Sequence, residues 1–187
     1  MTEVIGRRER KKAQTRQALA DAALELFLAR GYDEVGVKEV ADAADVSVTT
    51  LFKYFPSKEA LLFDQDDDIE AGLVRAVHGR PPGYSIVDAL REHMLRDSAD
   101  GGPSPEFIRL IESTPVLRDY ARSMWMRHET ALAKAIAEEM GAPEDDVSCA
   151  SLARFALASR ELIVASANPR KAAETIFGNL GRGWRVE

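Results

Sequence analysis

Residues 47–58 bring together hydroxyl, aromatic and cationic side chains at spacings that suit contact with duplex DNA. On a helix over residues 48–55, Leu51 and Phe55 fall on one side. The opposite side carries Val48, Thr49, Phe52 and Lys53. Apolar side chains are poor choices for a surface facing water, but they suit base edges and thymine methyl groups in a major groove. The alternative is that the valine and the phenylalanine of this side belong to the core.

The flanks of the same helix suit phosphate rather than base contacts. Thr50 and Tyr54 each offer a hydroxyl that can bond a phosphate, which fixes register without reading sequence. Lys58 lies where the next helix is expected to begin, and helix N-terminal amides with a nearby cation favour an anion. The chemistry indicated is therefore recognition of a polyanion with a sequence-dependent face.

This helix spans only about two turns, too few to be stable in isolation, so its neighbours must position it. Val37 to Ala44 predicts a second short helix, and Ser47 can cap the helix that follows. Two short helices joined by a tight turn form a helix-turn-helix. A longer helix is expected over residues 11–30, ended by Gly31 in a left-handed conformation. The apolar face of that longer helix comprises Leu19, Ala23, Leu26 and Phe27.

Helical periodicity continues to the end of the chain, with no alternating strand pattern of useful length. The fold class is therefore all-α, with about nine helices. Proline at the first helical position, after a capping residue, marks three of the later starts, at Ser104-Pro105, Thr114-Pro115 and Asn168-Pro169. The later helices are expected over residues 58–78, 86–98, 105–112, 115–140, 145–167 and 169–184.

The stretch from Gly31 to Lys58 resembles the TetR family of bacterial regulators. The matching residues are Leu26-Phe27, Gly31-Tyr32, Val37 to Ala41, Ala44, Val46-Ser47, Thr50-Leu51-Phe52 and Tyr54 to Leu61. They cover about a third of the chain, and the Tyr-Phe-x-Ser-Lys ending is absent from a generic helix-turn-helix. Three positions depart from the usual pattern: Asp45 replaces glycine in the turn, Gly36 replaces a capping hydroxyl, and Phe52 replaces tyrosine.

The resemblance implies a sequence-specific DNA-binding regulator, most simply a repressor that a small molecule releases from its operator. It implies that positions matching Lys38, Val48, Thr49, Phe52 and Lys53 meet bases, and that those matching Thr50, Tyr54 and Lys58 meet phosphates. It also implies a DNA-binding domain over residues 1–57 and an effector-binding and dimerisation domain over residues 58–187. The predicted DNA-binding residues are Lys38, Ser47, Val48, Thr49, Thr50, Phe52, Lys53, Tyr54 and Lys58.

The expected helix over residues 145–167 is apolar on most sides, and the final helix, over residues 169–184, carries one apolar stripe. We expect them to pair with their copies in a two-fold, four-helix interface, with an intrachain core as the alternative. A dimer would set two recognition helices about 34–36 Å apart, on successive major-groove turns. The predicted interface residues are Phe155, Ile163, Ile176, Phe177, Leu180 and Trp184.

Aromatic and methionine side chains in the C-terminal region suit an adaptable, largely apolar effector pocket. Ordinary core packing is the alternative for every one of them. The predicted pocket residues are Phe107, Ile111, Met124, Trp125, His128 and Phe155. The polar group of an effector could be oriented by His93, His128, Arg109 or Glu112, among which nothing in the sequence selects.

The net charge of −6 argues against nonspecific nucleic-acid binding by the whole surface. Residues 1–63 hold ten basic and ten acidic side chains, whereas residues 64–187 hold 15 basic and 21 acidic ones. Six of the cations lie between Arg7 and Arg16, either as an arm that reaches DNA or as a solvated tail. The acidic cluster over residues 64–70 reads as a solvated face rather than a metal site.

The remaining composition favours a cytoplasmic protein without a metal or cofactor. The chain has no secretory signal and no apolar run long enough for a bilayer, and its lone cysteine, Cys149, excludes an internal disulfide. Two other function classes compete with the regulator: a small helical enzyme or carrier, and a dimeric scaffold without DNA binding. Against the first, we find no phosphate loop, paired metal-ligand spacing or activated nucleophile.

Overall fold

The computed structural model describes residues 6–99 and 103–183, and in this part of the chain every regular element is helical. Its contacts divide the chain into two compact units. The first unit comprises residues 1–65 and 104–121, and the second comprises residues 66–103 and 122–187. The all-α fold class predicted from the sequence is confirmed.

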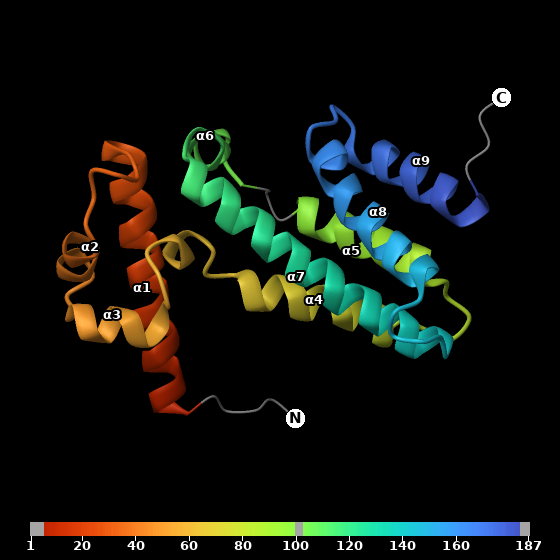
Figure 1. Ribbon diagram of the computed structural model, residues 1–187, viewed down its shortest axis with the longest axis horizontal. Helices are drawn as coiled ribbons and strands as arrows, with labels where there is room; N and C mark the ends of the chain where they lie inside the picture. Colours follow the sequence, from red (N-terminus) through yellow and green to blue (C-terminus); the bar gives the residue numbers. More distant parts are fainter. Residues whose placement is uncertain (1–5, 100–102, 184–187) are drawn as a thin grey trace. The chain divides into compact units, whose positions relative to one another are not determined.

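The first unit holds α1 (Arg7–Arg30), α2 (Val37–Ala43), α3 (Val48–Tyr54), the short 3-10 turn η1 (Glu59–Leu62) and α6 (Pro105–Ser113) (Figure 1). Its core is formed by the predicted face of α1, of which Leu19, Ala23 and Phe27 are fully buried. Val40 from α2 and Leu51 from α3 are each 0% exposed against it. A recognition helix of seven residues thus gains its stability from apolar packing rather than from its own length.

Local signals in the sequence set the ends of these helices. Gly31 ends α1 with φ +88°, and Asp45 adopts φ +53° in the turn between α2 and α3, where the family usually has glycine. Ser47 Oγ accepts the backbone N–H of Thr50 at 3.1 Å and so caps α3, as predicted. Gly36 has no capping side chain, but Glu39 accepts its backbone N–H at 2.9 Å. Hydrogen bonds therefore stabilise the starts of α2 and α3, and the positive φ of Asp45 allows the tight turn between them.

One predicted helix is wrong: residues 58–78 form η1 and then a separate helix, α4 (Asp66–His78). Phe63 leaves the helical region with φ −120° and ψ 44°. Its ring stacks on Tyr120 at 5.1 Å and meets Phe107 edge-on at 6.4 Å. The break lets Phe63 join the core of the first unit, which a continuous helix would not allow.

The second unit holds α4, α5 (Ile86–Ala99), α8 (Val147–Val164), α9 (Pro169–Arg182) and the later part of α7 (Pro115–Met140). Its core includes Leu73, Leu90, Ile136 and Phe177, none more than 2% exposed. Cys149 is buried in this core, and its burial raises the pKa of the thiol. Through residues 6–99 and 103–183, no helix has the length and apolar composition of a bilayer span.

Residues 104–121 return to the first unit because Phe107, Leu110 and Leu117 pack on its core. Each of the two units is therefore built from two separate segments of the chain. The predicted boundary at residue 57 separates functions rather than contacts, and it stays a prediction.

Candidate nucleic-acid interface

Helix α3 has one buried and one open side. Leu51 and Phe55 are 0% and 1% exposed, whereas Thr49 and Lys53 are exposed and Phe52 keeps 48% of its surface open. Val48 was predicted on the open side but is half-buried and packs against the core. The side chains that can meet a base edge without rearrangement are therefore those of Thr49, Phe52 and Lys53.

The first turn of α3 is organised by hydroxyl groups. Ser47 Oγ and Thr50 Oγ1 lie 2.9 Å apart and share a hydrogen bond, in addition to the backbone cap. Both residues keep some exposure, Ser47 more than Thr50. These hydroxyl groups cap α3, so a phosphate that bonds them must share them with the existing hydrogen bonds of the cap.

Arg16 of α1 holds the other end of α3. Its Nη1 donates to the carbonyl of Tyr54 at 3.1 Å and its Nη2 to the carbonyl of Asp64 at 2.8 Å. Its guanidinium lies 4.7 Å from the ring centroid of Phe55. The sequence placed Arg16 only within a basic cluster; the structure makes it the link between α1, the last carbonyl of α3 and the chain after η1.

Lys58 is held inside the first unit. Its Nζ donates to the carbonyl of Tyr32 at 2.5 Å and lies 3.9 Å from the centroid of that ring. Burial lowers the pKa of Lys58. The expected setting, the N-terminus of a long helix, is wrong because η1 has only four residues. A phosphate contact by Lys58 stays a prediction, and it requires the ammonium group to leave the Tyr32 carbonyl.

The Tyr32 hydroxyl completes this brace by donating to the Glu59 carboxylate at 2.6 Å. Burial and the bond to Glu59 raise the pKa of Tyr32 well above its usual value. Burial alone would raise the pKa of Glu59, but hydrogen bonds from Tyr32 and Ser57 leave it lowered. Tyr32 therefore binds the Glu59 carboxylate through its hydroxyl and the Lys58 ammonium group through its carbonyl and its ring.

Lys38, on α2, is exposed and donates to Asp42 one turn later at 2.9 Å. The side chains of this pair keep 79% and 63% of their surface open. Exposed pairs of this kind are weak, so Lys38 can exchange its partner for a phosphate or a base.

The predicted pocket residues are divided between the two units. Phe107 and Ile111 pack on the core of the first unit, and Phe155 is 57% exposed on α8. Met124, Trp125 and His128 lie together on α7 in the second unit. Phe107 and Ile111 share α6 in the first unit, so the six predicted residues do not line one pocket within a single unit.

His128 is the most confined polar group of this trio, with 0% exposure. Its Nε2 lies 2.6 Å from Asp66 Oδ1, and Arg127 donates to the other oxygen of that carboxylate at 2.6 Å. Trp125 meets the imidazole edge-on at 5.1 Å. Among the described residues, His128 Nδ1 is the one buried side-chain nitrogen or oxygen without a hydrogen-bond partner.

The predicted dimer residues fall into two groups. Ile163 and Phe177 are 0% and 1% exposed inside the second unit, so their prediction as interface residues is wrong. Ile176 and Leu180 pack partly against the same core. Phe155 is open, and Trp184 lies outside the described residues.

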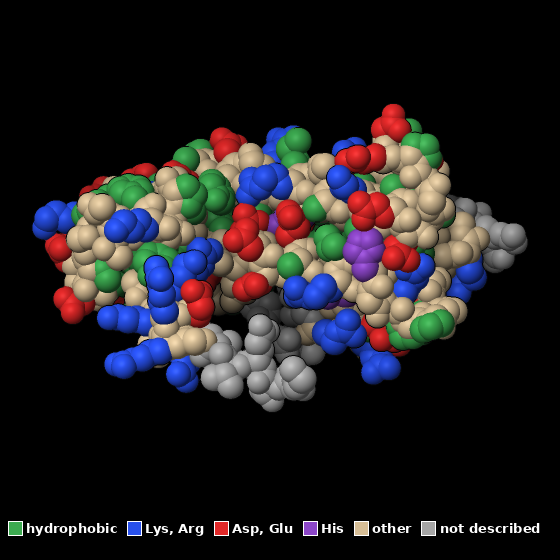
Figure 2. Space-filling view, turned by 90° about the horizontal axis from the view of Figure 1, so that it is seen from below, with side chains coloured by type: hydrophobic (Ala, Val, Ile, Leu, Met, Phe, Trp, Pro, Cys, Tyr) green, Lys and Arg blue, Asp and Glu red, His purple; other side chains and the backbone are tan. Residues whose placement is uncertain are grey.

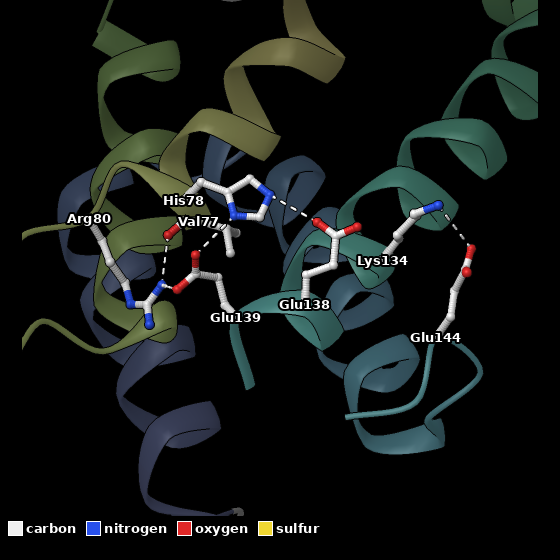
Figure 3. A network of polar contacts seen from close by, with 7 residues as sticks. All are labelled: Val77, His78, Arg80, Lys134, Glu138, Glu139 and Glu144. Carbon is white, nitrogen blue, oxygen red and sulfur yellow. Dashed lines mark hydrogen bonds and ion pairs between the residues drawn. The ribbon is translucent and has the colours of Figure 1, made fainter. Parts of the chain in front are cut away.

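A polar network that the sequence did not indicate lies near the end of α4 (Figure 3). His78 Nδ1 and Arg80 Nη1 both contact Glu139, at 3.0 and 2.5 Å, and Arg80 also donates to the Val77 carbonyl. These bonds hold the pKa of Glu139 below its usual value. The network borders an open hollow lined by His78, Arg80, Pro81, Pro82, Gly83, Tyr84, Ser85 and Glu139. Within the described ranges, no group of three or more His, Cys, Asp or Glu side chains forms a metal site.

Comparison with known proteins agrees with this geometry. A family described as "Bacterial regulatory proteins, tetR family" matches residues 19–64, which include α2 and α3. The HTH-type transcriptional regulator TcmR of Streptomyces glaucescens is 34% identical over 152 residues, 75% of this chain and 67% of TcmR. The putative mycofactocin biosynthesis transcriptional regulator MftR of Mycobacterium tuberculosis is 29% identical over 141 residues, 73% of this chain and 71% of MftR.

Solved structures share the whole architecture. A TetR-family regulator from Streptomyces coelicolor has a TM-score of 0.64 at 18% identity, covering 95% of this chain and 98% of its own. The repressor FadR of Thermus thermophilus, solved with lauroyl-CoA, has a TM-score of 0.55 at 26% identity, covering 92% and 96%. The chain belongs to the TetR family of bacterial regulatory proteins and is a helix-turn-helix DNA-binding transcriptional regulator.

Proposed function

We propose that the protein is a cytoplasmic repressor that binds operator DNA as a homodimer and leaves it when a small-molecule effector binds the second unit. The observation that carries the proposal is the two-sided burial of α3: Leu51 fixes the helix in the core while Phe52 and Lys53 stay open. An exposed phenylalanine beside a cation, on a short helix that its other side anchors in the core, suits insertion into a major groove.

Within this proposal the open side reads sequence and the flanks fix register. Lys53 donates to guanine or to a phosphate, and the ring of Phe52 contacts thymine methyl groups. The Thr50 and Tyr54 hydroxyls bind phosphates, which carry no sequence information. Lys38 joins them after releasing Asp42.

The second copy is expected to dock on α8. Val147, Phe155 and Leu162 are 77%, 57% and 65% exposed, and their spacing places them within about 80° of the helix circumference. Large apolar side chains so open on one helix face indicate an interface. The buried Ile163 and Phe177 belong to the core in which α8 packs on α9, so they support this face without lying on it.

The effector is expected to contact Met124, Trp125 and His128. A buried methionine adapts to an apolar ligand, and the unpartnered His128 Nδ1 can accept a hydrogen bond from a hydroxyl or N–H group of that ligand. The related repressor FadR was solved with lauroyl-CoA, a ligand that combines an apolar chain with polar groups. For the present chain we propose the same general combination and no particular compound.

Selection of duplexes from a random library, followed by fluorescence anisotropy, tests DNA recognition. We expect Lys53→Ala to change the preferred bases, and Tyr54→Ala to weaken all sequences similarly. An exposed cation of the second unit, Arg122, provides the control Arg122→Ala, which should leave the preference unchanged. A selection that returns no enriched sequence with the wild-type protein would refute the regulator.

Sedimentation tests the dimer. Leu162→Glu places a charge in the proposed interface and should yield monomers at micromolar concentration. Met140→Glu is the matched control, because Met140 is 62% exposed on α7, outside the α8 face. Equal oligomeric states of the two variants would contradict the α8 interface while leaving DNA recognition untouched.

A further inference from the structure

The basic residues at the start of the chain lie on a rigid helix rather than on an arm. Helix α1 begins at Arg7, so Arg7, Arg8, Arg10, Lys11 and Lys12 all lie in its first two turns. We name these five residues the basic spur. The whole of residues 7–14 is exposed, and the first buried residue of α1 is Leu19. At a rise of 1.5 Å per residue, this open section is about 12 Å long.

The cations of the basic spur are not neutralised by neighbouring carboxylates in the described part of the chain. None of the five forms an ion pair with a carboxylate in the described part of the chain, and Glu9 is the one acid among them. Each residue turns the helix by about 100°, so the five cations cover about 200° of its circumference. Further along α1 the buried Ala20 and Phe27 lie on the remaining side, and the buried Leu19 lies in line with Arg8 and Lys12, three and two turns beyond them. Lys and Arg side chains gather on this part of the surface in Figure 2.

This charge pattern works against the helix that carries it. Arg7 with Lys11, and Arg8 with Lys12, are like-charged pairs one turn apart, which destabilise a helix. Cations in the first turn also oppose the helix dipole. A polyanion beside the spur would reverse both penalties, because its phosphates neutralise the repelling charges.

The position of the spur selects duplex DNA as that polyanion. Arg16 lies one turn beyond Lys12 and bonds the carbonyl of Tyr54, at the end of the recognition helix. The spur therefore starts from the same unit and beside the same helix end that the DNA-reading face uses, and in Figure 1 the red end of α1 runs on beyond α3. Its reach of about 12 Å corresponds to roughly three to four base pairs of duplex.

We propose that the basic spur binds backbone phosphates of the DNA that flanks the bases read by α3. The contact supplies affinity and on-rate without sequence information, and a rigid helix holds it in register with the recognition helix. The proposal rests on the DNA-binding function proposed above and adds a second, sequence-independent contact to it.

The test measures the salt dependence of operator binding on two duplexes. The short duplex ends at the outermost base pair needed by α3, and the long duplex adds about ten base pairs, one helical turn, at each end. The full-length variant R8Q/K12Q removes two spur cations, or four in a homodimer. The control R75Q/R122Q removes the same charge from exposed positions in the second unit.

On the long duplex, each lost phosphate contact should make the negative slope of log K against log salt less steep by about 0.9. That corresponds to about 3.5-fold in affinity between 50 and 200 mM salt. R8Q/K12Q removes up to four contacts in a homodimer, so its slope on the long duplex should become less steep by up to about 3.6. It should match the wild type on the short duplex, whereas R75Q/R122Q should follow the wild type on both.

Equal slopes for wild type and R8Q/K12Q on the long duplex would overturn the proposal. So would equal losses in R8Q/K12Q and R75Q/R122Q, since net charge alone would then explain them. Both results leave sequence-specific binding in place, which separates them from failure of the proposed function, where the wild type has no preferred duplex. Because each glutamine keeps helix propensity and removes repulsion, we expect an unchanged or higher melting temperature for R8Q/K12Q.

Discussion

Replacing Arg16 by lysine should loosen the recognition helix while leaving the charge of the first unit unchanged. Arg16 makes two hydrogen bonds to carbonyl groups and one stacking contact with Phe55. A lysine keeps the charge and can retain one of these bonds, but it has no planar fork. The lost bond is worth about 1.5 kcal/mol and the lost stacking about 0.5–1 kcal/mol, so Arg16→Lys should cost about 2 kcal/mol.

Amide hydrogen exchange detects this cost where it arises. A loss of about 2 kcal/mol speeds exchange through local opening about 30-fold. We expect this acceleration at the amides of Leu51 and Phe55, whose N–H groups bond Ser47 and Leu51. Amides of α8, in the second unit, should exchange at wild-type rates.

Arg8→Lys is the matched control, because Arg8 is exposed on the same helix and retains its charge. Operator affinity of Arg16→Lys should fall with the protection of α3, since an opened helix cannot read a groove. Wild-type exchange at Leu51 and Phe55 in Arg16→Lys would refute the reasoning, and so would equal acceleration in both units.

Three further changes test single contacts. Ser47→Ala removes the cap of α3 and should lower stability by about 1 kcal/mol, measured by urea unfolding monitored at the first unit. Tyr32→Phe removes the donor to Glu59 and should cost about 1 kcal/mol at pH 7. Because the pKa of Glu59 is lowered in the folded protein, its contribution is present above the usual carboxyl pKa and is lost as pH falls, so the difference between Tyr32→Phe and wild type should shrink in acid. Asp66→Ala leaves the buried His128 without its one hydrogen bond and should lower stability by about 2 kcal/mol in thermal unfolding, while Asp67→Ala, at an exposed neighbour, should stay within about 0.5 kcal/mol.

The features that the sequence predicted correctly are those determined locally. The cap at Ser47, the turn at Asp45 and the end of α1 at Gly31 each depend on residues within one turn of the chain. The sequence did not predict the break at Phe63, because the ring on which Phe63 stacks belongs to Tyr120, 57 residues further along the chain. Arg16 was missed for the same reason, since its two acceptor carbonyls lie 38 and 48 residues further along.

Periodicity also fails where a helix is apolar on several sides. The pattern of α8 predicted that some apolar residues face a second copy, but it did not distinguish Ile163 from its neighbour Leu162. In the structure Ile163 is fully buried and Leu162 is 65% exposed. Adjacent residues on a helix point about 100° apart, so the assignment depends on which side packs against α9 and α5, and that is a property of the tertiary fold.

Residues 1–63 have no formal net charge, but their charges are unevenly distributed, because several acidic side chains form internal bonds while many basic ones do not. Glu39 bonds Arg30 and the Gly36 amide, Asp42 bonds Lys38, and Glu59 bonds Tyr32. These carboxylates serve the internal architecture of the helix-turn-helix. The exposed cations of the basic spur and Lys53 form no ion pair with a carboxylate in the described part of the chain. Residues 1–63, with ten charges of each sign, therefore present uncompensated positive charge at the start of α1 and on the open side of α3, the two surfaces proposed to bind DNA.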